Sequence, residues 1–135
     1  MIPSRLLFLF VILLALSCKS PQPAANTAAE KPKYEMKKYW LTFLLRGDNR
    51  SHDSSTAANI QAAHIRNIER LAAEGKIIMA GPIGVNRDLR GIFIIDAPDS
   101  LTAASYINTD SAVITGRLKF EVLPWWTAKG TYIFK

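Results

Sequence analysis

His64 and Asp110 are the candidates for a pair of side chains that transfers protons. His64 is one of two histidines among the 135 residues, and it lies on the apolar stripe of an expected helix. An imidazole titrates near neutral pH, and a carboxylate that orients it makes it an effective general acid or base. Asp110 follows a second expected helix, and its carboxylate reaches His64 if the two helices pack side by side. A core histidine and an aspartate that caps a turn fit the same pattern, so both interpretations stay open.

Arginines at the ends of expected strands are candidates for holding a ligand. Arg46 ends one strand just before Gly47, and Arg90 begins another. A guanidinium at the mouth of a pocket would bind a carboxylate or phenolate through charge-assisted hydrogen bonds, whereas a solvated arginine at a strand end needs no ligand. Gly81 and Pro82 are expected to line such a pocket as backbone features and not to react.

Other chemistries lack the residues that they need. His52 lies in a polar loop, and Cys18 is the only cysteine, so no zinc-type cluster can be assembled. The chain has no glycine-rich phosphate loop after a strand and no G-x-S-x-G motif. We therefore expect no metal and no cofactor. Trp125 and Trp126 would either stack on a ligand or pack at the edge of a dimer.

Six elements are expected to position these residues, in the order strand, helix, strand, strand, helix, strand. Apolar periodicity predicts a first helix over 57–74, capped by a residue in 54–56, and a second helix from Asp99 or Ser100 to about Asn108. Strands are expected over 39–46, 76–82, 89–96 and 116–126. Two units with right-handed crossovers then give an α+β, ferredoxin-like βαββαβ fold. Its four-stranded antiparallel sheet carries both helices on one face.

This topology leaves the second face of the sheet uncovered. The first strand, 39–46, has apolar residues on both of its faces. A contiguous apolar surface on a small domain marks an interaction site, and the simplest partner is a second copy of the chain. We therefore predict a homodimer that forms through the open face.

The N-terminal segment is typical of an export signal over residues 1–17. Arg5 precedes an apolar run over 6–16, which is too short for a permanent membrane helix of roughly 20 residues. The residues before Cys18 resemble the lipobox of bacterial lipoproteins, although Ala15 stands where such boxes favour leucine. Acylation of Cys18 would anchor the chain by two lipid chains. An ordinary secretory signal with an incidental cysteine is the alternative.

The remaining boundaries follow from composition and charge. Residues 18–38 are rich in proline, alanine and lysine and predict a flexible tether, followed by a domain over 39–130 and a tail over 131–135. Much of the formal net charge of +6 belongs to the tether. A nucleic-acid partner is therefore not expected. The expected location is the bacterial cell envelope, in the periplasm or at the outer membrane, with secretion as the alternative.

Three segments resemble the YCII-related domain: AHIRNIERLAAEGKIIMAGP (63–82), DLRGIFIIDAPDSLTAASYINTDSAV (88–113) and EVLPWW (121–126). The resemblance covers the region from Tyr39 to about Gly130 and implies a dimeric α/β barrel. It also implies a catalytic pair at His64 and Asp110, with Ser111 standing where the family has proline. Members with known chemistry include a dehydrochlorinase that acts on a chlorinated aromatic ring, and most others have no assigned substrate.

Two functional hypotheses follow. In the first, the domain is a cofactor-independent catalyst of the lyase or isomerase type that acts on a small anionic or aromatic compound. His64 is its base, Asp110 orients the imidazole, and Arg46 or Arg90 holds the substrate. In the second, the domain is a non-catalytic dimeric lipoprotein module that binds a ligand or serves a structural role.

Overall fold

The computed structural model describes residues 33–132. The expected signal over 1–17, the acylation site at Cys18 and most of the expected tether lie outside the described residues. Within the described part, no helix has both the length and the apolar character needed to cross a membrane.

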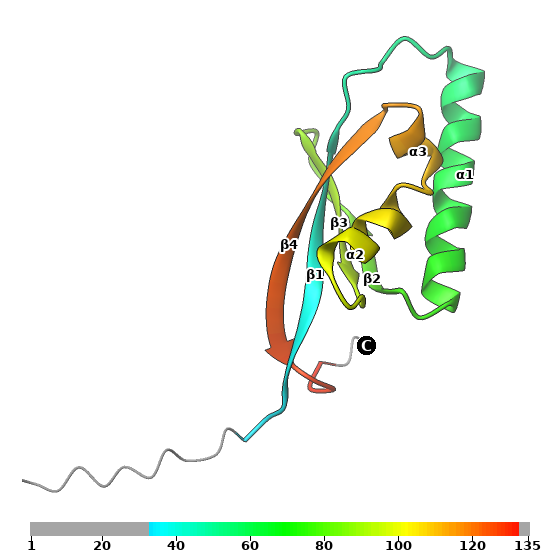
Figure 1. Cartoon of the computed structure of the whole chain (residues 1–135). Coiled ribbons are helices and arrows are strands. Elements are labelled where there is room, and N and C mark those ends of the chain that lie inside the picture. Colours follow the sequence, from blue (N-terminus) through cyan, green and yellow to red (C-terminus); the bar gives the residue numbers. More distant parts are fainter. Residues whose placement is uncertain (1–32, 133–135) are drawn as a thin grey trace, which may run out of the picture. The chain divides into compact units, whose positions relative to one another are not determined.

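The described strands form an antiparallel sheet in the order β2-β3-β1-β4, and the helices lie to one side of it (Figure 1). Their bounds are β1 (Met36–Arg46), α1 (Ser54–Ala73), β2 (Ile77–Pro82), β3 (Leu89–Ile95), α2 (Ser100–Ile107), α3 (Ser111–Ile114) and β4 (Leu118–Ala128). This order confirms the predicted α+β, ferredoxin-like arrangement. The one-turn helix α3 was not predicted, because four residues are too few to show helical periodicity.

Helix α1 begins and ends where local chemistry satisfies its exposed backbone groups. Asp53 is its N-cap and accepts a hydrogen bond from the backbone N–H of Thr56, so the prediction that the cap lies within 54–56 is wrong by one residue. At the other end Gly75 adopts a positive φ of 70°, which reverses the chain into β2. Between these ends, Ile60, His64 and Leu71 are the buried residues of the helix. The helix therefore turns the predicted stripe, with His64 in it, toward the interior.

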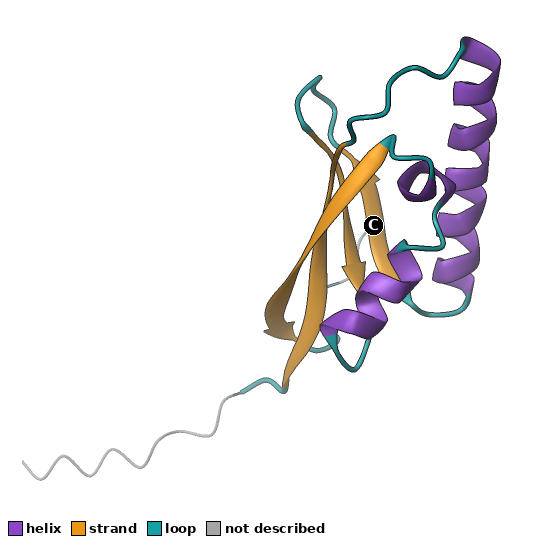
Figure 2. Cartoon of the chain, turned by 45° about the horizontal axis from the view of Figure 1, so that its top comes forward, coloured by secondary structure: helices purple, strands orange, loops and turns teal. Residues whose placement is uncertain are grey.

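The two faces of the sheet differ in what covers them. The helices lie on one face (Figure 2), and there Trp40, Thr42 and Leu44 of β1 are buried. The opposite face carries Leu41 and Phe43, which are only half-buried. Cross-strand partners share a face, which places further apolar side chains beside them: Ile92, Ile94 and Leu123. No described element of the chain covers this open face.

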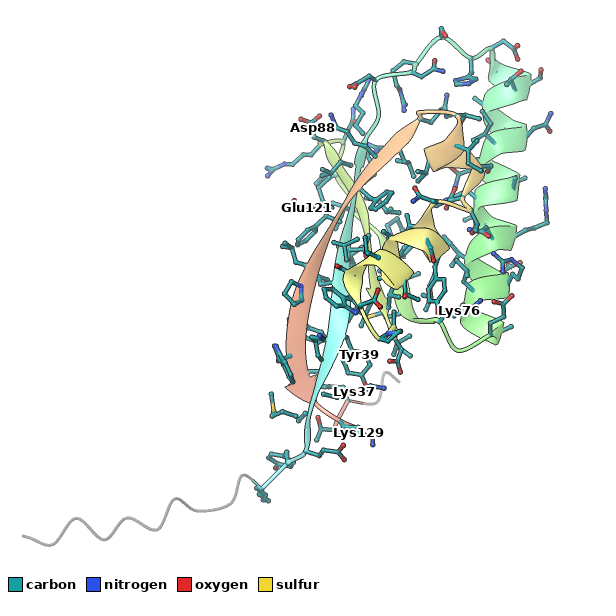
Figure 3. All side chains as sticks on the ribbon, viewed as in Figure 1. Lys37, Tyr39, Lys76, Asp88, Glu121 and Lys129 are labelled. Carbon is teal, nitrogen blue, oxygen red and sulfur yellow. The ribbon has the colours of Figure 1, made fainter. Side chains whose placement is uncertain are left out.

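Strand β1 begins at Met36, three residues before the predicted strand. Its first residues pair with the end of β4, where Lys38 lies opposite Trp126 and Met36 opposite Ala128. Strand β3 ends opposite Trp40, so β1 and β4 continue beyond it as a two-stranded extension. Lys37, at the foot of β1 in Figure 3, forms an ion pair with Asp96. This pairing is long-range in sequence, which is why a lysine-rich segment gave no local signal of a strand.

Candidate functional site

The structure places the side chains of His64 and Asp110 in direct contact. Nδ1 of His64 lies 2.5 Å from Oδ2 of Asp110. Both residues are buried, with 8% of His64 and 1% of Asp110 exposed. His64 comes from the middle of α1, and Asp110 immediately precedes α3. The pair therefore joins two elements that are far apart in sequence.

Asp110 is held by its own helix end as well as by His64. Its second carboxylate oxygen, Oδ1, accepts a hydrogen bond of 2.8 Å from the backbone N–H of Ala112, which makes Asp110 the N-cap of α3. Ser111 adds a hydrogen bond of 3.0 Å from its hydroxyl to the carbonyl of Ile60, one turn before His64 on α1. The capping role and the pairing role that the sequence left open are thus filled by the same carboxylate.

The other ring nitrogen of His64 remains available for chemistry. Because Nδ1 contacts Asp110, the ring presents Nε2 as its second functional atom. No hydrogen bond joins Nε2 to another group among the described residues, and the ring is stacked against Phe93, with centroids 6.4 Å apart. His64 also lines a cavity. The pair therefore has the arrangement of a histidine oriented by a buried carboxylate and open to a ligand.

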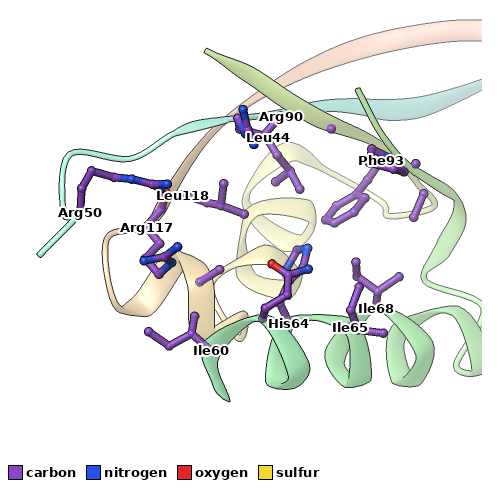
Figure 4. Close-up of a pocket in the computed structure, with 16 residues that line it drawn as sticks. Leu44, Arg50, Ile60, His64, Ile65, Ile68, Arg90, Phe93, Arg117 and Leu118 are labelled. Carbon is purple, nitrogen blue, oxygen red and sulfur yellow. Dashed lines mark hydrogen bonds between the residues drawn. The ribbon is translucent and has the colours of Figure 1, made fainter. Parts of the chain in front are cut away.

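The cavity lies between α1 and the covered face of the sheet and has a volume of about 440 Å³ (Figure 4). Most of its walls are apolar: Leu44, Ile60, Ile65, Ile68, Ala80, Phe93, Ala112 and Leu118. Gly81 and Pro82 of β2 also line it. A volume of this size is in the range of small-molecule sites.

Three arginines line the same cavity, and we call them the arginine rim: Arg50, Arg90 and Arg117. Arg90 was a candidate from the sequence, whereas Arg50 and Arg117 were not. Both missed residues lie just outside regular elements, Arg50 in the loop after β1 and Arg117 one residue before β4. Arg46 is not among the residues that line this cavity. It borders a second depression, whose other charged lining residues are Asp48, Asp88, Lys119 and Arg50, so that Arg50 borders both hollows.

The pKa of one rim arginine is lowered by loss of water and by its positive neighbours. The pKa of Arg50 lies below its ordinary value, first because burial removes water from the guanidinium. The guanidinium groups of Arg117, Arg46 and Arg90 add to this effect in that order. Arg46 therefore contributes to the field at this end of the domain even though it does not line the cavity.

Several other candidates lie away from the cavity. Trp125 packs near Tyr39, with ring centroids 6.5 Å apart, and neither Trp125 nor Trp126 lines the cavity. His52 is half-buried in the loop before α1. Across residues 33–132, no group of three histidine, cysteine, aspartate or glutamate side chains comes together in a way that could hold a metal ion.

The fold and the buried pair together define an α+β, ferredoxin-like domain with a histidine–aspartate site beneath a cavity. Residues 41–126 match the model of the YCII-related domain, and the chain belongs to this family. No curated protein matches the chain. Among solved structures, the chain is similar to the 5-chloro-2-hydroxyhydroquinone dehydrochlorinase of Burkholderia phenoliruptrix AC1100 in complex with 2,5-dihydroxybenzoquinone. The sequence identity is 25%, the match covers 63% of this chain and 92% of that chain, and the TM-score is 0.44.

Proposed function

We propose that the domain is a cofactor-independent acid–base catalyst that acts on a small anionic or aromatic compound. One observation carries this proposal: a buried carboxylate contacts Nδ1 of a histidine that lines a cavity of about 440 Å³. In this role His64 transfers a proton through Nε2, and Asp110 orients the ring.

The chemistry follows from the tautomer that the pair favours. When Nδ1–H donates to Asp110, the lone pair of the neutral ring lies on Nε2, which then accepts a proton from a substrate in the cavity. The carboxylate also stabilises the imidazolium that forms, as the aspartate does in serine protease triads. Return of this proton to another atom completes an isomerisation, and loss of a leaving group completes an elimination. Both reactions are within the lyase and isomerase classes.

The test is proton exchange with solvent. We would incubate the purified full chain in D₂O with a panel of hydroxylated and carboxylated benzenes and follow deuterium incorporation and product formation by NMR. His64→Gln should lower the rate by about 10²- to 10⁴-fold, the usual contribution of a positioned general base. Asp110→Asn should also lower it, because an amide favours the other ring tautomer.

His52→Gln is the matched control, since His52 is the second histidine of the chain and does not line the cavity. It should leave the rate unchanged. If wild-type protein binds members of the panel but neither exchanges nor converts any of them, the catalytic proposal fails and a ligand-binding module takes its place.

We further propose that Cys18 is acylated and holds the domain at a membrane of the bacterial cell envelope. The support is the sequence alone: an apolar run that ends at a lone cysteine, followed by a lysine-rich segment. Metabolic labelling with a palmitate analogue in a bacterial host tests this. The label should be present in the wild-type chain and absent after Cys18→Ser, and equal labelling of the two would contradict the proposal.

We also propose that two copies associate through the open face of the sheet. The support is the row of half-buried apolar side chains on β1, among them Leu41 and Phe43, which no described element covers. Light scattering should give twice the mass of one chain, and Phe43→Asp should yield a folded monomer. Glu121→Gln is a control, because it changes the neighbour of Phe43 on β4 without placing a charge in the face.

A further inference from the structure

The arginine rim holds three positive charges without a carboxylate partner. Within residues 33–132, no aspartate or glutamate oxygen lies within 4.0 Å of the guanidinium nitrogens of Arg50, Arg90 or Arg117. The hydrogen bonds that the rim does make go to neutral acceptors. Arg50 donates to the carbonyl of Arg117 at 3.2 Å, and Arg90 donates to Oδ1 of Asn86 at 3.0 Å and to the carbonyl of Arg87 at 3.2 Å.

The carboxylate of Asp110, which contacts His64, does not compensate this charge. Asp110 already contacts His64 through Oδ2 and caps α3 through Oδ1. The carboxylates of Asp48 and Asp88 border the second depression, which Arg50 also borders, but they do not line the cavity and neither forms an ion pair with Arg50. Among the described residues that line the cavity, three are arginines and none is acidic. Like charges held close together destabilise a fold, which favours the view that this arrangement serves a ligand.

Two arginines and a purely apolar part of the cavity wall lie on opposite sides of His64. Figure 4 shows Arg50 and Arg117 on one side of His64, together with Ile60 and Leu118, and Phe93, Ile65 and Ile68 on the other side; Arg90 lies apart from the other two arginines, beside Leu44. The loop after β1, the start of β3 and the residue before β4 supply the arginines, while α1 and the middle of β3 supply the apolar end. A ligand that fills both ends must carry its negative charge at one end of an apolar body.

We propose that the cavity binds a small ring compound that carries a carboxylate, with the carboxylate held by Arg50, Arg90 and Arg117 and the ring packed against Phe93, Ile65 and Ile68. This inference rests on the proposed function in placing the ligand beside His64, and it names the substrate class of that site. Planar guanidinium groups suit a planar carboxylate, which accepts two parallel N–H donors. In this arrangement the ring of the ligand lies over Nε2 of His64. Its carboxylate lies at the arginine rim, away from the atom that exchanges a proton.

The experiment compares three probes on the full chain: benzoate, its neutral counterpart benzamide, and acetate, which has the charge without the ring. Binding is measured by calorimetry and by the shift of the His64 ring resonances. Benzoate should bind saturably and most tightly, since it alone satisfies both ends. Replacing a rim arginine by glutamine should weaken benzoate binding about tenfold or more, the usual value of a charge-assisted hydrogen bond. Benzamide binding should be unchanged by the same substitutions.

Arg66→Gln is the matched control, because Arg66 is an exposed arginine of α1 that does not line the cavity. It should bind benzoate as wild-type protein does. Circular dichroism of each variant establishes that it is folded, and Arg90→Lys offers a second variant that keeps the charge but loses the planar donor pair.

The outcomes separate this inference from the proposed function. If benzoate binding depends on the rim but no proton exchange is found, the rim has its ligand and the catalytic proposal fails. If exchange depends on His64 but benzoate does not bind saturably, or binds no better than benzamide, or is indifferent to the rim substitutions, the inference is overturned and the catalytic proposal stands.

Discussion

The buried pair and the arginine rim lie on one cavity and handle charge in opposite ways. Every polar atom of the Asp110 carboxylate has a partner, and the residue is 1% exposed. The rim arginines are more exposed and have no acidic partner among the described residues. A buried charge needs its partners for the chain to fold, whereas an exposed charge can be left for a ligand. The comparison therefore assigns the buried pair to the stability of the site and the arginine rim to the binding of a ligand.

Removing the buried carboxylate should have the largest effect. Asp110→Ala deletes both the cap of α3 and the partner of His64, so we expect the free energy of unfolding to fall by about 3 kcal/mol. Urea denaturation measures it. Asp96→Ala, which breaks the half-exposed pair with Lys37, is the control and should cost less than about 1 kcal/mol. If the free energy of unfolding fell equally in the two variants, the buried pair would contribute no more to stability than the half-exposed pair.

A second buried polar group tests whether hydrogen-bond partners decide how a buried polar group affects the stability of the fold. Thr42 is fully buried and its hydroxyl has no hydrogen-bond partner among the described residues. Thr42→Val should therefore raise the free energy of unfolding by about 1 kcal/mol, since it removes an unsatisfied group at nearly constant shape. Thermal denaturation measures it, with the partly exposed Thr127→Val as control. A loss of stability would mean that the hydroxyl is bonded in solution.

Asp53, the N-cap of α1, extends the comparison to a carboxylate that has hydrogen-bond donors but is exposed to solvent. Hydrogen bonds from the backbone of Thr56 and the side chains of Ser55 and Thr56 lower the pKa of Asp53 to about 2. A lowered pKa contributes stability above the unfolded value near 3.8, and that contribution is lost as the pH falls through about 2. Asp53→Asn keeps a capping oxygen but removes this dependence. The difference in unfolding midpoint between wild type and variant should therefore shrink between pH 4 and pH 2.

The smallest effect should come from the rim and should have the opposite sign. Arg117→Gln relieves repulsion with Arg50, so the melting temperature should rise slightly at low ionic strength. The gain should vanish in concentrated salt, which screens exposed charges. Arg66→Gln provides the comparison for a general loss of positive charge. If both variants respond alike, the rim is not under local electrostatic strain.

The fold could be predicted because its main elements carry local signals. The stripe through Ile60, His64 and Leu71 predicts α1, and the alternation in β4 predicts a half-exposed strand, which the structure has with half-buried and exposed residues in turn. The contact between His64 and Asp110 depends on how α3 packs against α1, and the resemblance to the family indicated it where spacing alone left it open. Arg50 and Arg117 had no such signal, because irregular backbone brings them to the cavity and no periodicity marks their positions.

The direction of β1 sets the orientation of the whole site. The strand begins at Met36, where the preceding chain joins the domain, and ends at Arg46, beside the start of β4 and the residues of the rim. Its 11 residues span ~35 Å at about 3.3 Å per residue. Arg117 and the other residues of the arginine rim therefore lie toward the end of β1 that is opposite to Met36, about the full length of the strand from the point where the chain enters the domain.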